Sequence, residues 1–82
     1  MENFRNKLAR YLDHGDLSQA ALASKINCSQ ATVNRYRNGK RFPDARTALL
    51  IDKVTDGGVP FSEWETDFLA RSGIPSIQGA RA

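Results

Sequence analysis

The chain has 82 residues, of which 40% are hydrophobic and 26% are charged. This length leaves room for one compact domain and excludes a multi-domain enzyme, and the composition is that of a globular protein. The longest apolar run, at residues 48–51, is far shorter than the roughly 20 residues of a membrane-spanning helix. Charged residues stand where a signal peptide needs its apolar stretch, and the single Cys28 cannot form an internal disulfide. We therefore expect a cytoplasmic protein with no membrane association.

Positive and negative charges are separated along the chain, although the net charge is only +3. Residues 29–46 carry five cations and one carboxylate, whereas residues 47–70 carry one cation and five carboxylates. We expect the folded domain to have a basic face that attracts a polyanion. A basic run is also typical of an ordinary solvated surface, which is the alternative interpretation of this feature.

The first two predicted elements are helices. One helical face of the first is formed by Phe4, Leu8, Tyr11 and Leu12, and the pair His14-Gly15 is typical of a helix end. Ser18 is a candidate N-cap for a second helix that carries Ala21, Leu22 and Ala23 and ends near Asn27. Because Asn tolerates the left-handed backbone better than other non-glycine residues, Asn27 can form a tight turn between two short helices.

A third helix is predicted to follow this turn at once. Ser29 is its candidate N-cap, Thr32, Val33 and Tyr36 lie within it, and Gly39 occupies the C′ position after Asn38. Two short helices joined by a tight turn, with a small residue at Ala23 where they cross and a basic stretch behind them, are typical of a helix-turn-helix.

Two further helices are predicted in the second half of the chain. The fourth helix is expected to begin at Phe42-Pro43-Asp44, because proline suits a first helical turn. Its apolar residues follow helical spacing at Ala45, Ala48, Leu49 and Val54, and the pair Gly57-Gly58 ends it. Residues 62–65 fit the capping-box pattern at Ser62 and Glu65, which predicts a fifth helix with Phe61, Trp64, Phe68 and Leu69. No segment has the alternation of a strand. We expect the domain to span residues 1–70 and residues 71–82 to form a flexible tail.

The segment LSQAALASKINCSQATVNRYRNG, residues 17–39, resembles without gaps the DNA-binding segment of the lambda-repressor and Cro superfamily, also called the XRE family. The resemblance extends more loosely over residues 4–56, and residues 42–58 are similar to the segment after the motif in small phage Cro-type and YdaS-like proteins. Asn27 stands where the family usually has glycine. This resemblance implies an all-α, five-helix, lambda-repressor-like DNA-binding domain with its helix-turn-helix at residues 18–38.

Helical geometry selects a reading face on the third helix. Val33 and Tyr36 lie on one side of the wheel, and the opposite side carries Gln30, Ala31, Asn34, Arg35 and Asn38. Asn and Gln can pair with adenine, Arg can pair with guanine, and an alanine methyl can contact a thymine methyl. We expect Gln30, Ala31, Asn34 and Arg35 to contact bases.

Other residues are expected to contact the DNA backbone. The resemblance implies that Gln19 contacts phosphate and braces Gln30, and that Asn38 holds phosphate just past the recognition helix. Arg37, Lys40 and Arg41 would continue along the backbone and supply affinity rather than choice of sequence. Ser18 and Thr32 complete the expected set.

The remaining candidate residues have simpler interpretations. Cys28 is expected to be packing rather than a redox sensor, and His14 has no companion residues at metal-ligand spacing. Phe61, Trp64 and Phe68 form either ordinary core or an exposed patch that pairs with a second copy. No cofactor, metal ion or small-molecule ligand is expected.

These patterns predict a sequence-specific transcriptional regulator that binds double-stranded DNA. The expected form is a phage or prophage Cro-type repressor that occupies a near-palindromic operator as a dimer and blocks the promoter. One alternative is the DNA-binding antitoxin of a toxin-antitoxin pair. Another is a helical protein-interaction module whose contact face is Phe61, Trp64 and Phe68. An enzyme fits least, because nothing pairs a nucleophile with a base.

Overall fold

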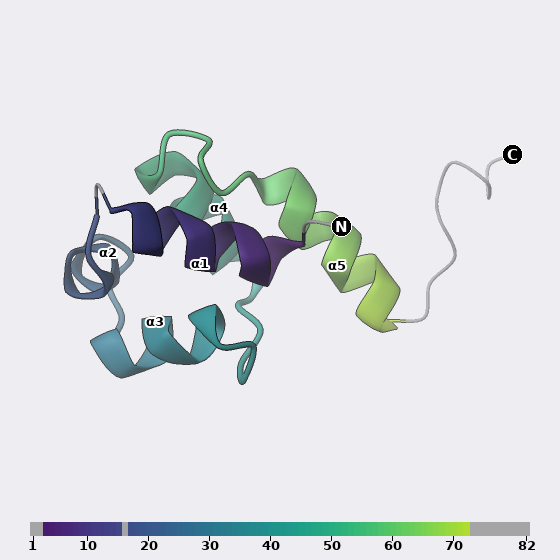
Figure 1. The fold of residues 1–82 in the computed structure, drawn as a ribbon. Helices are drawn as coiled ribbons and strands as arrows, with labels where there is room; N and C mark the ends of the chain where they lie inside the picture. Colours follow the sequence, from purple (N-terminus) through teal and green to yellow (C-terminus); the bar gives the residue numbers. More distant parts are fainter. Residues whose placement is uncertain (1–2, 16, 73–82) are drawn as a thin grey trace, which may run out of the picture.

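A computed structural model describes residues 3–15 and 17–72, which form five α-helices and no strand (Figure 1). The helices are α1 (Phe4–His14), α2 (Gln19–Lys25), α3 (Gln30–Arg37), α4 (Ala45–Val54) and α5 (Phe61–Ser72). The predicted all-α, five-helix fold is confirmed. No helix in the described part of the chain is both long enough and apolar enough to cross a membrane.

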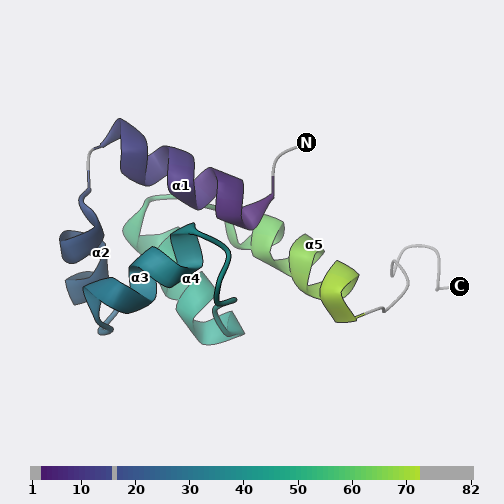
Figure 2. The same cartoon turned by 60° about the horizontal axis from the view of Figure 1, so that its bottom comes forward.

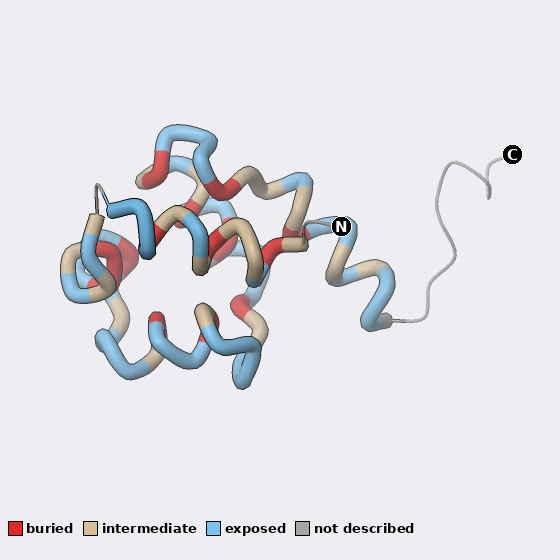
Figure 3. Tube along the Cα trace, viewed as in Figure 1, coloured by how far each residue is buried: buried red, intermediate tan, exposed pale blue. Residues whose placement is uncertain are grey.

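The core lies where the inner faces of all five helices meet. Its largest fully buried side chains are Phe4, Leu8, Leu22, Val33, Ile51 and Val59. The buried positions of α1 recur every four residues, so Phe4, Leu8 and Leu12 lie on one side of that helix. Figure 3 shows buried stretches on the sides of α1 and α3 that face each other. The apolar inner faces of α1, α2 and α3 bury one another, and this burial holds α3 against α1 and α2.

Local signals end the first and third helices where the sequence predicts. Gly15 and Gly39 both have left-handed backbones, with φ of 77° and 75°. A side chain at Gly39 would also collide with Arg5, because a Cβ atom there would lie 2.6 Å from the Arg5 Cδ atom. The chain therefore turns sharply after α3 and passes close to the first helix.

The start of α4 differs from its prediction. Pro43 lies outside the helix rather than in its first turn, because Asp44 is the N-cap and accepts a hydrogen bond from the Thr47 N–H at 2.8 Å. Of the apolar residues at helical spacing, Ala48 is buried together with Ile51, whereas Leu49 is 53% exposed.

The capping box predicted at Ser62 is wrong. Helix α5 begins at Phe61, and the Phe61 N–H donates to Asp52 Oδ2 at 2.7 Å, so a carboxylate from α4 supplies the partner that a local cap would have supplied. At its other end, α5 continues to Ser72, two residues into the predicted tail, and residues 73–82 lie outside the described residues.

Candidate nucleic-acid interface

The turn between α2 and α3 has the geometry that the sequence predicts. Asn27 adopts a left-handed backbone with φ of 60°, and the Cys28 N–H donates to the Ala23 carbonyl at 2.9 Å. Ser18 and Ser29 cap the two helices, accepting hydrogen bonds from the N–H groups three residues ahead. Ala23 is 3% exposed, and its small side chain lets the two helices approach closely.

This turn places α3 on the outside of the domain. In Figure 2 α3 faces the viewer in front of α4, with α2 beside it and no other element over its outer side. Val33 and Tyr36 point into the core and are 0% and 6% exposed. The outer side of α3 is therefore available to a large ligand along its whole length.

The four predicted base-contacting residues lie together on this outer side. Gln30, Ala31, Asn34 and Arg35 are all exposed, and with Gln19 they line an open hollow of about 440 Å³. We call Gln30, Ala31, Asn34 and Arg35 the reading face. Amide, guanidinium and methyl groups on one exposed helix are the groups that recognise base edges in a major groove.

Hydrogen bonds between amide side chains hold part of the reading face in place. Asn34 Nδ2 donates to Gln19 Oε1 at 3.4 Å, and Asn38 Nδ2 donates to Asn34 Oδ1 at 3.0 Å. The resemblance implied that Gln19 braces Gln30, whereas in the structure the partner of Gln19 is Asn34. This bond links the first turn of α2 to the middle of α3.

The residues expected at the DNA backbone have different surroundings in the structure. The Ser18 hydroxyl accepts from the Ala21 N–H, and the Thr32 hydroxyl is hydrogen-bonded to that of Ser29, so these two groups already have partners within the domain. Arg37 turns toward α1, where its Nη2 atom lies 2.7 Å and 2.9 Å from the two carboxylate oxygens of Asp13. The other two cations, Lys40 and Arg41, are exposed.

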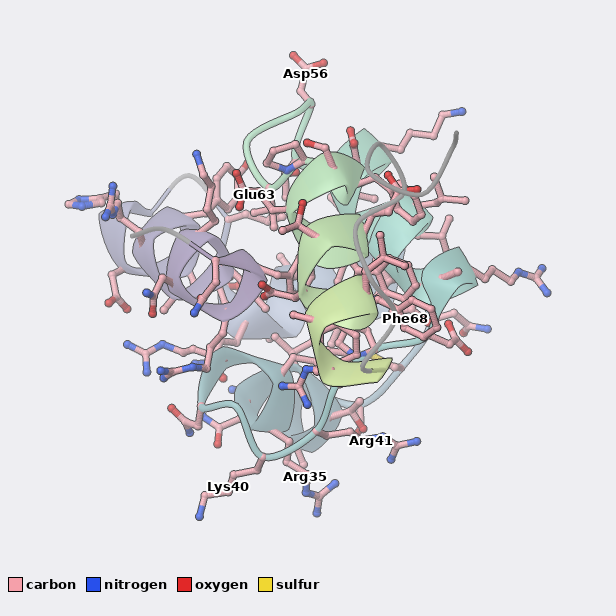
Figure 4. The ribbon with its side chains drawn as sticks, turned by 90° about the vertical axis from the view of Figure 1, so that its right-hand side faces the viewer. Arg35, Lys40, Arg41, Asp56, Glu63 and Phe68 are labelled. Carbon is pink, nitrogen blue, oxygen red and sulfur yellow. The ribbon has the colours of Figure 1, made fainter. Side chains whose placement is uncertain are left out.

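Charge is distributed unevenly over the molecule. Arg35, Lys40 and Arg41 project from one end, whereas Asp56 and Glu63 lie toward the opposite end (Figure 4). Three cations of the basic block thus lie on α3 and on the loop behind it. A polyanion that approaches α3 meets positive charge first and stays distant from the acidic end.

Cys28 packs against the core. Its side chain is half-buried, and burial raises the pKa of the thiol, an effect that the nearby positive charge of Arg41 only partly opposes. A thiol with a raised pKa remains protonated and unreactive near neutral pH. Within residues 3–15 and 17–72, no three His, Cys, Asp or Glu side chains gather in the way that a metal site requires.

The three aromatic residues predicted as core or dimer patch differ in burial. Trp64 is 5% exposed, stacks on Phe42, Phe61 and Phe68, and donates its indole N–H to the Pro43 carbonyl at 2.8 Å. Phe61 is half-buried, and Phe68 is 41% exposed. Next to Phe68 lies an apolar hollow of about 610 Å³ that also includes Pro43, Ala45 and Leu69.

Sequence reasoning missed several contacts at long sequence separation, and two of them join α1 to other helices. One is the ion pair between Asp13 and Arg37, and the other is the hydrogen bond from the Phe4 N–H to Asp67 Oδ2 at 2.9 Å. Each joins residues from different helices, and no motif or spacing marks either pair.

The fold and the exposed α3 define a helix-turn-helix DNA-binding domain. A family model described as Helix-turn-helix matches residues 8–64, which is more than half of the chain. The chain belongs to this family, in its lambda-repressor and Cro-like form, and is a DNA-binding transcriptional regulator. Neither the curated proteins nor the solved structures contain a match to it.

Proposed function

We propose that this protein is a Cro-type repressor that binds a near-palindromic operator in double-stranded DNA as a homodimer. The observation that carries the proposal is the reading face, in which Gln30, Asn34 and Arg35 are exposed together on the outer side of α3. In the docking geometry of helix-turn-helix proteins, for which the lambda and Cro repressors are standard examples, such a helix lies in the major groove. The repressor acts in the cytoplasm, by occupying a promoter.

Affinity and choice of sequence come from different residues in this proposal. Gln30, Asn34 and Arg35 select bases, and Ala31 contacts a thymine methyl. Lys40 and Arg41, which flank the end of α3, attract the phosphates, together with polar contacts from Ser18, Gln19, Thr32 and Asn38. Arg37 is proposed as a weaker backbone contact than Lys40 and Arg41, because its guanidinium is paired with Asp13.

A second copy is proposed to pair through the exposed end of α5. This helix extends beyond the other four (Figure 1). Phe68 is exposed on it, and the apolar hollow beside Phe68 lies between α5 and residues 42–45. Pairing covers the apolar surface and places two recognition helices about 34 Å apart, one turn of DNA.

Selection of bound sequences from a random double-stranded DNA pool at physiological salt tests the function. The expected result is a near-palindrome with two half-sites about one helical turn apart. A single half-site would support sequence-specific binding but contradict the dimer. Recovery of nothing above background would contradict the repressor and favour the protein-interaction alternative.

Phe68→Glu tests the proposed dimer contact. A buried charge at the interface should prevent pairing, so titration of the selected operator should show independent filling of the two half-sites instead of cooperative filling. Ser62→Glu adds the same charge at the exposed first turn of the same helix and should leave pairing unchanged. Equal pairing by the two variants would place the dimer contact elsewhere.

A further inference from the structure

Four side chains of the interface and one carboxylate form a continuous chain of hydrogen bonds across three helices. It begins at Asp13 on α1, which accepts from Arg37 Nη2 at 2.7 Å. Arg37 Nη1 donates to Asn38 Oδ1 at 3.1 Å. From there the bonds continue to Asn34 and Gln19, at 3.0 Å and 3.4 Å. We call this sequence of contacts the amide chain.

The chemistry of Arg37 gives the amide chain a direction. A guanidinium has five N–H donors and no acceptor, so Asn38 must turn its oxygen toward Arg37. The Asn38 amino group then faces Asn34 and donates to its oxygen, and the Asn34 amino group in turn donates to Gln19 Oε1. One cation at the end of α3 therefore determines which way three amides are turned.

With the amides turned this way, Asn34 and Gln19 keep hydrogen-bonding groups that can contact DNA. An amide oxygen has two acceptor positions and an amide nitrogen two hydrogens, and Asn34 uses one of each in the amide chain. It keeps one acceptor and one donor, which is what adenine N6 and N7 require. Gln19 accepts with its oxygen, so its amino group remains as a donor suited to phosphate.

Asp13 holds the end of the amide chain. Its two oxygens bind one nitrogen of Arg37, whose side chain is 29% exposed, and this ion pair keeps the guanidinium directed along α1 rather than toward a phosphate. Without Asp13, Arg37 loses the carboxylate that orients it and is drawn to the nearest phosphate on DNA. Asn38 is then free to turn its amide over, and the order in the following amides is lost.

We propose that Asp13, a residue outside the DNA contact surface, is a positioning residue that sets base preference at Asn34 through Arg37 and Asn38. This inference rests on the proposed reading of bases by α3. The Asp13 side chain is 54% exposed, and surface ion pairs contribute little to folding, so Asp13 can be replaced without unfolding the domain.

The free protein gives a test that needs no DNA. In Asp13→Ala, the side-chain amide NMR signals of Asn38, Asn34 and Gln19 should shift, and that of Gln30, which is outside the amide chain, should not. Asp13→Glu keeps a carboxylate and should restore the shifts in part. Asp56→Asn makes the same change in net charge at the opposite end of the molecule and should move none of these signals (Figure 4). Unchanged Asn38 and Asn34 signals in Asp13→Ala would overturn the inference.

Selection on DNA gives the functional test. Full loss of an amide-adenine pair, as in Asn34→Ala, reduces preference for that base between about 5-fold and about 150-fold. In Asp13→Ala we expect the preference for that base to fall by at least about 3-fold at the same base pair. Its affinity for random DNA should be unchanged or higher, because Arg37 becomes available to phosphate. A uniform loss on all sequences would contradict a positioning role.

A double variant shows whether Asp13 acts through Arg37. If it does, Asp13→Ala should cause no further loss of base preference when Arg37→Ala is already present. Additive losses would contradict the amide chain as the route. If wild-type protein selects no sequence at all, the proposed function fails, while the NMR result on the free protein still decides whether the amide chain exists.

Discussion

The side chains of Arg35 and Arg37 project from the same turn of α3, but their surroundings differ. Arg37 is half-buried against α1 and its charge is matched by Asp13, whereas Arg35 is exposed and borders the hollow of the reading face. The flat, forked guanidinium of Arg35 can therefore meet a base edge without breaking an existing ion pair. Two residues of identical chemistry thus have different expected roles.

Arg35→Ala should weaken binding to the selected operator by about 1–3 kcal/mol and relax the preference at one base pair, because a guanine contact is lost. Fluorescence anisotropy on the operator and on single-base variants of it measures both effects at one salt concentration. Arg35→Lys keeps the charge but not the fork, and should lose base preference while retaining most binding to random DNA. If alanine weakened every sequence equally, Arg35 would be a phosphate contact.

Residues whose structure depends on near neighbours could be predicted from the sequence. Ser18, Ser29 and Asn27 act through backbone groups within three residues of themselves, or through their own φ angle, so the residue types alone indicate the caps and the turn. Arg37 and Asp13 are 24 positions apart and meet only after the helices pack. The reading face was therefore predictable, and the contacts that orient it were not.

The same distinction holds for whole elements, as the starts of α4 and α5 show. Asp44 caps α4 through a local bond to Thr47, but α5 has its first N–H bound by Asp52 from the preceding helix. Ser62 therefore lies inside the helix and does not cap it. Local patterns locate both helices, but only in α4 does a local cap fix the first residue.

The cap of α4 gives an element-scale prediction that depends on pH. Hydrogen bonding from the Thr47 N–H lowers the pKa of Asp44 from its ordinary value. A pKa that is lower in the folded state means that this stabilisation is complete above the unfolded pKa of about 3.9 and is lost as the pH falls through the folded value. At pH 7, Asp44→Ala should therefore lower the free energy of unfolding by about 1 kcal/mol.

Urea denaturation at pH 7 and near pH 3 measures this effect as the difference between wild type and variant, so that other carboxylates cancel. The difference should shrink on acidification. Asp44→Asn keeps an oxygen acceptor and loses the titration, so its stability relative to Asp44→Ala should not vary with pH. A difference that stayed constant for Asp44→Ala would show that the charge of the carboxylate does not contribute to the cap.

At the scale of the whole molecule, part of the division of charge along the sequence becomes a division in space. The cations Arg35, Lys40 and Arg41 lie at the α3 end, and the carboxylates Asp56 and Glu63 lie toward the other end (Figure 4). The sequence predicted this polarity because each charged block lies on consecutive elements. It left open whether Trp64 was core or surface, because the stacking partner Phe42 belongs to the loop before α4.

This polarity predicts that two lysines of equal charge affect DNA binding unequally. Lys40 is exposed at the α3 end, and Lys53 is exposed in the last turn of α4, three residues before Asp56 at the acidic end. A cation that contacts phosphate releases about one counterion from DNA, so Lys40→Ala should reduce the slope of log K against log salt by about 0.9. Lys53→Ala makes the same change in net charge and should leave the slope as it is. Titrations of random-sequence DNA at four or five salt concentrations measure both slopes, and equal slopes for the two variants would mean that net charge, rather than the position of the basic end, governs attraction to DNA.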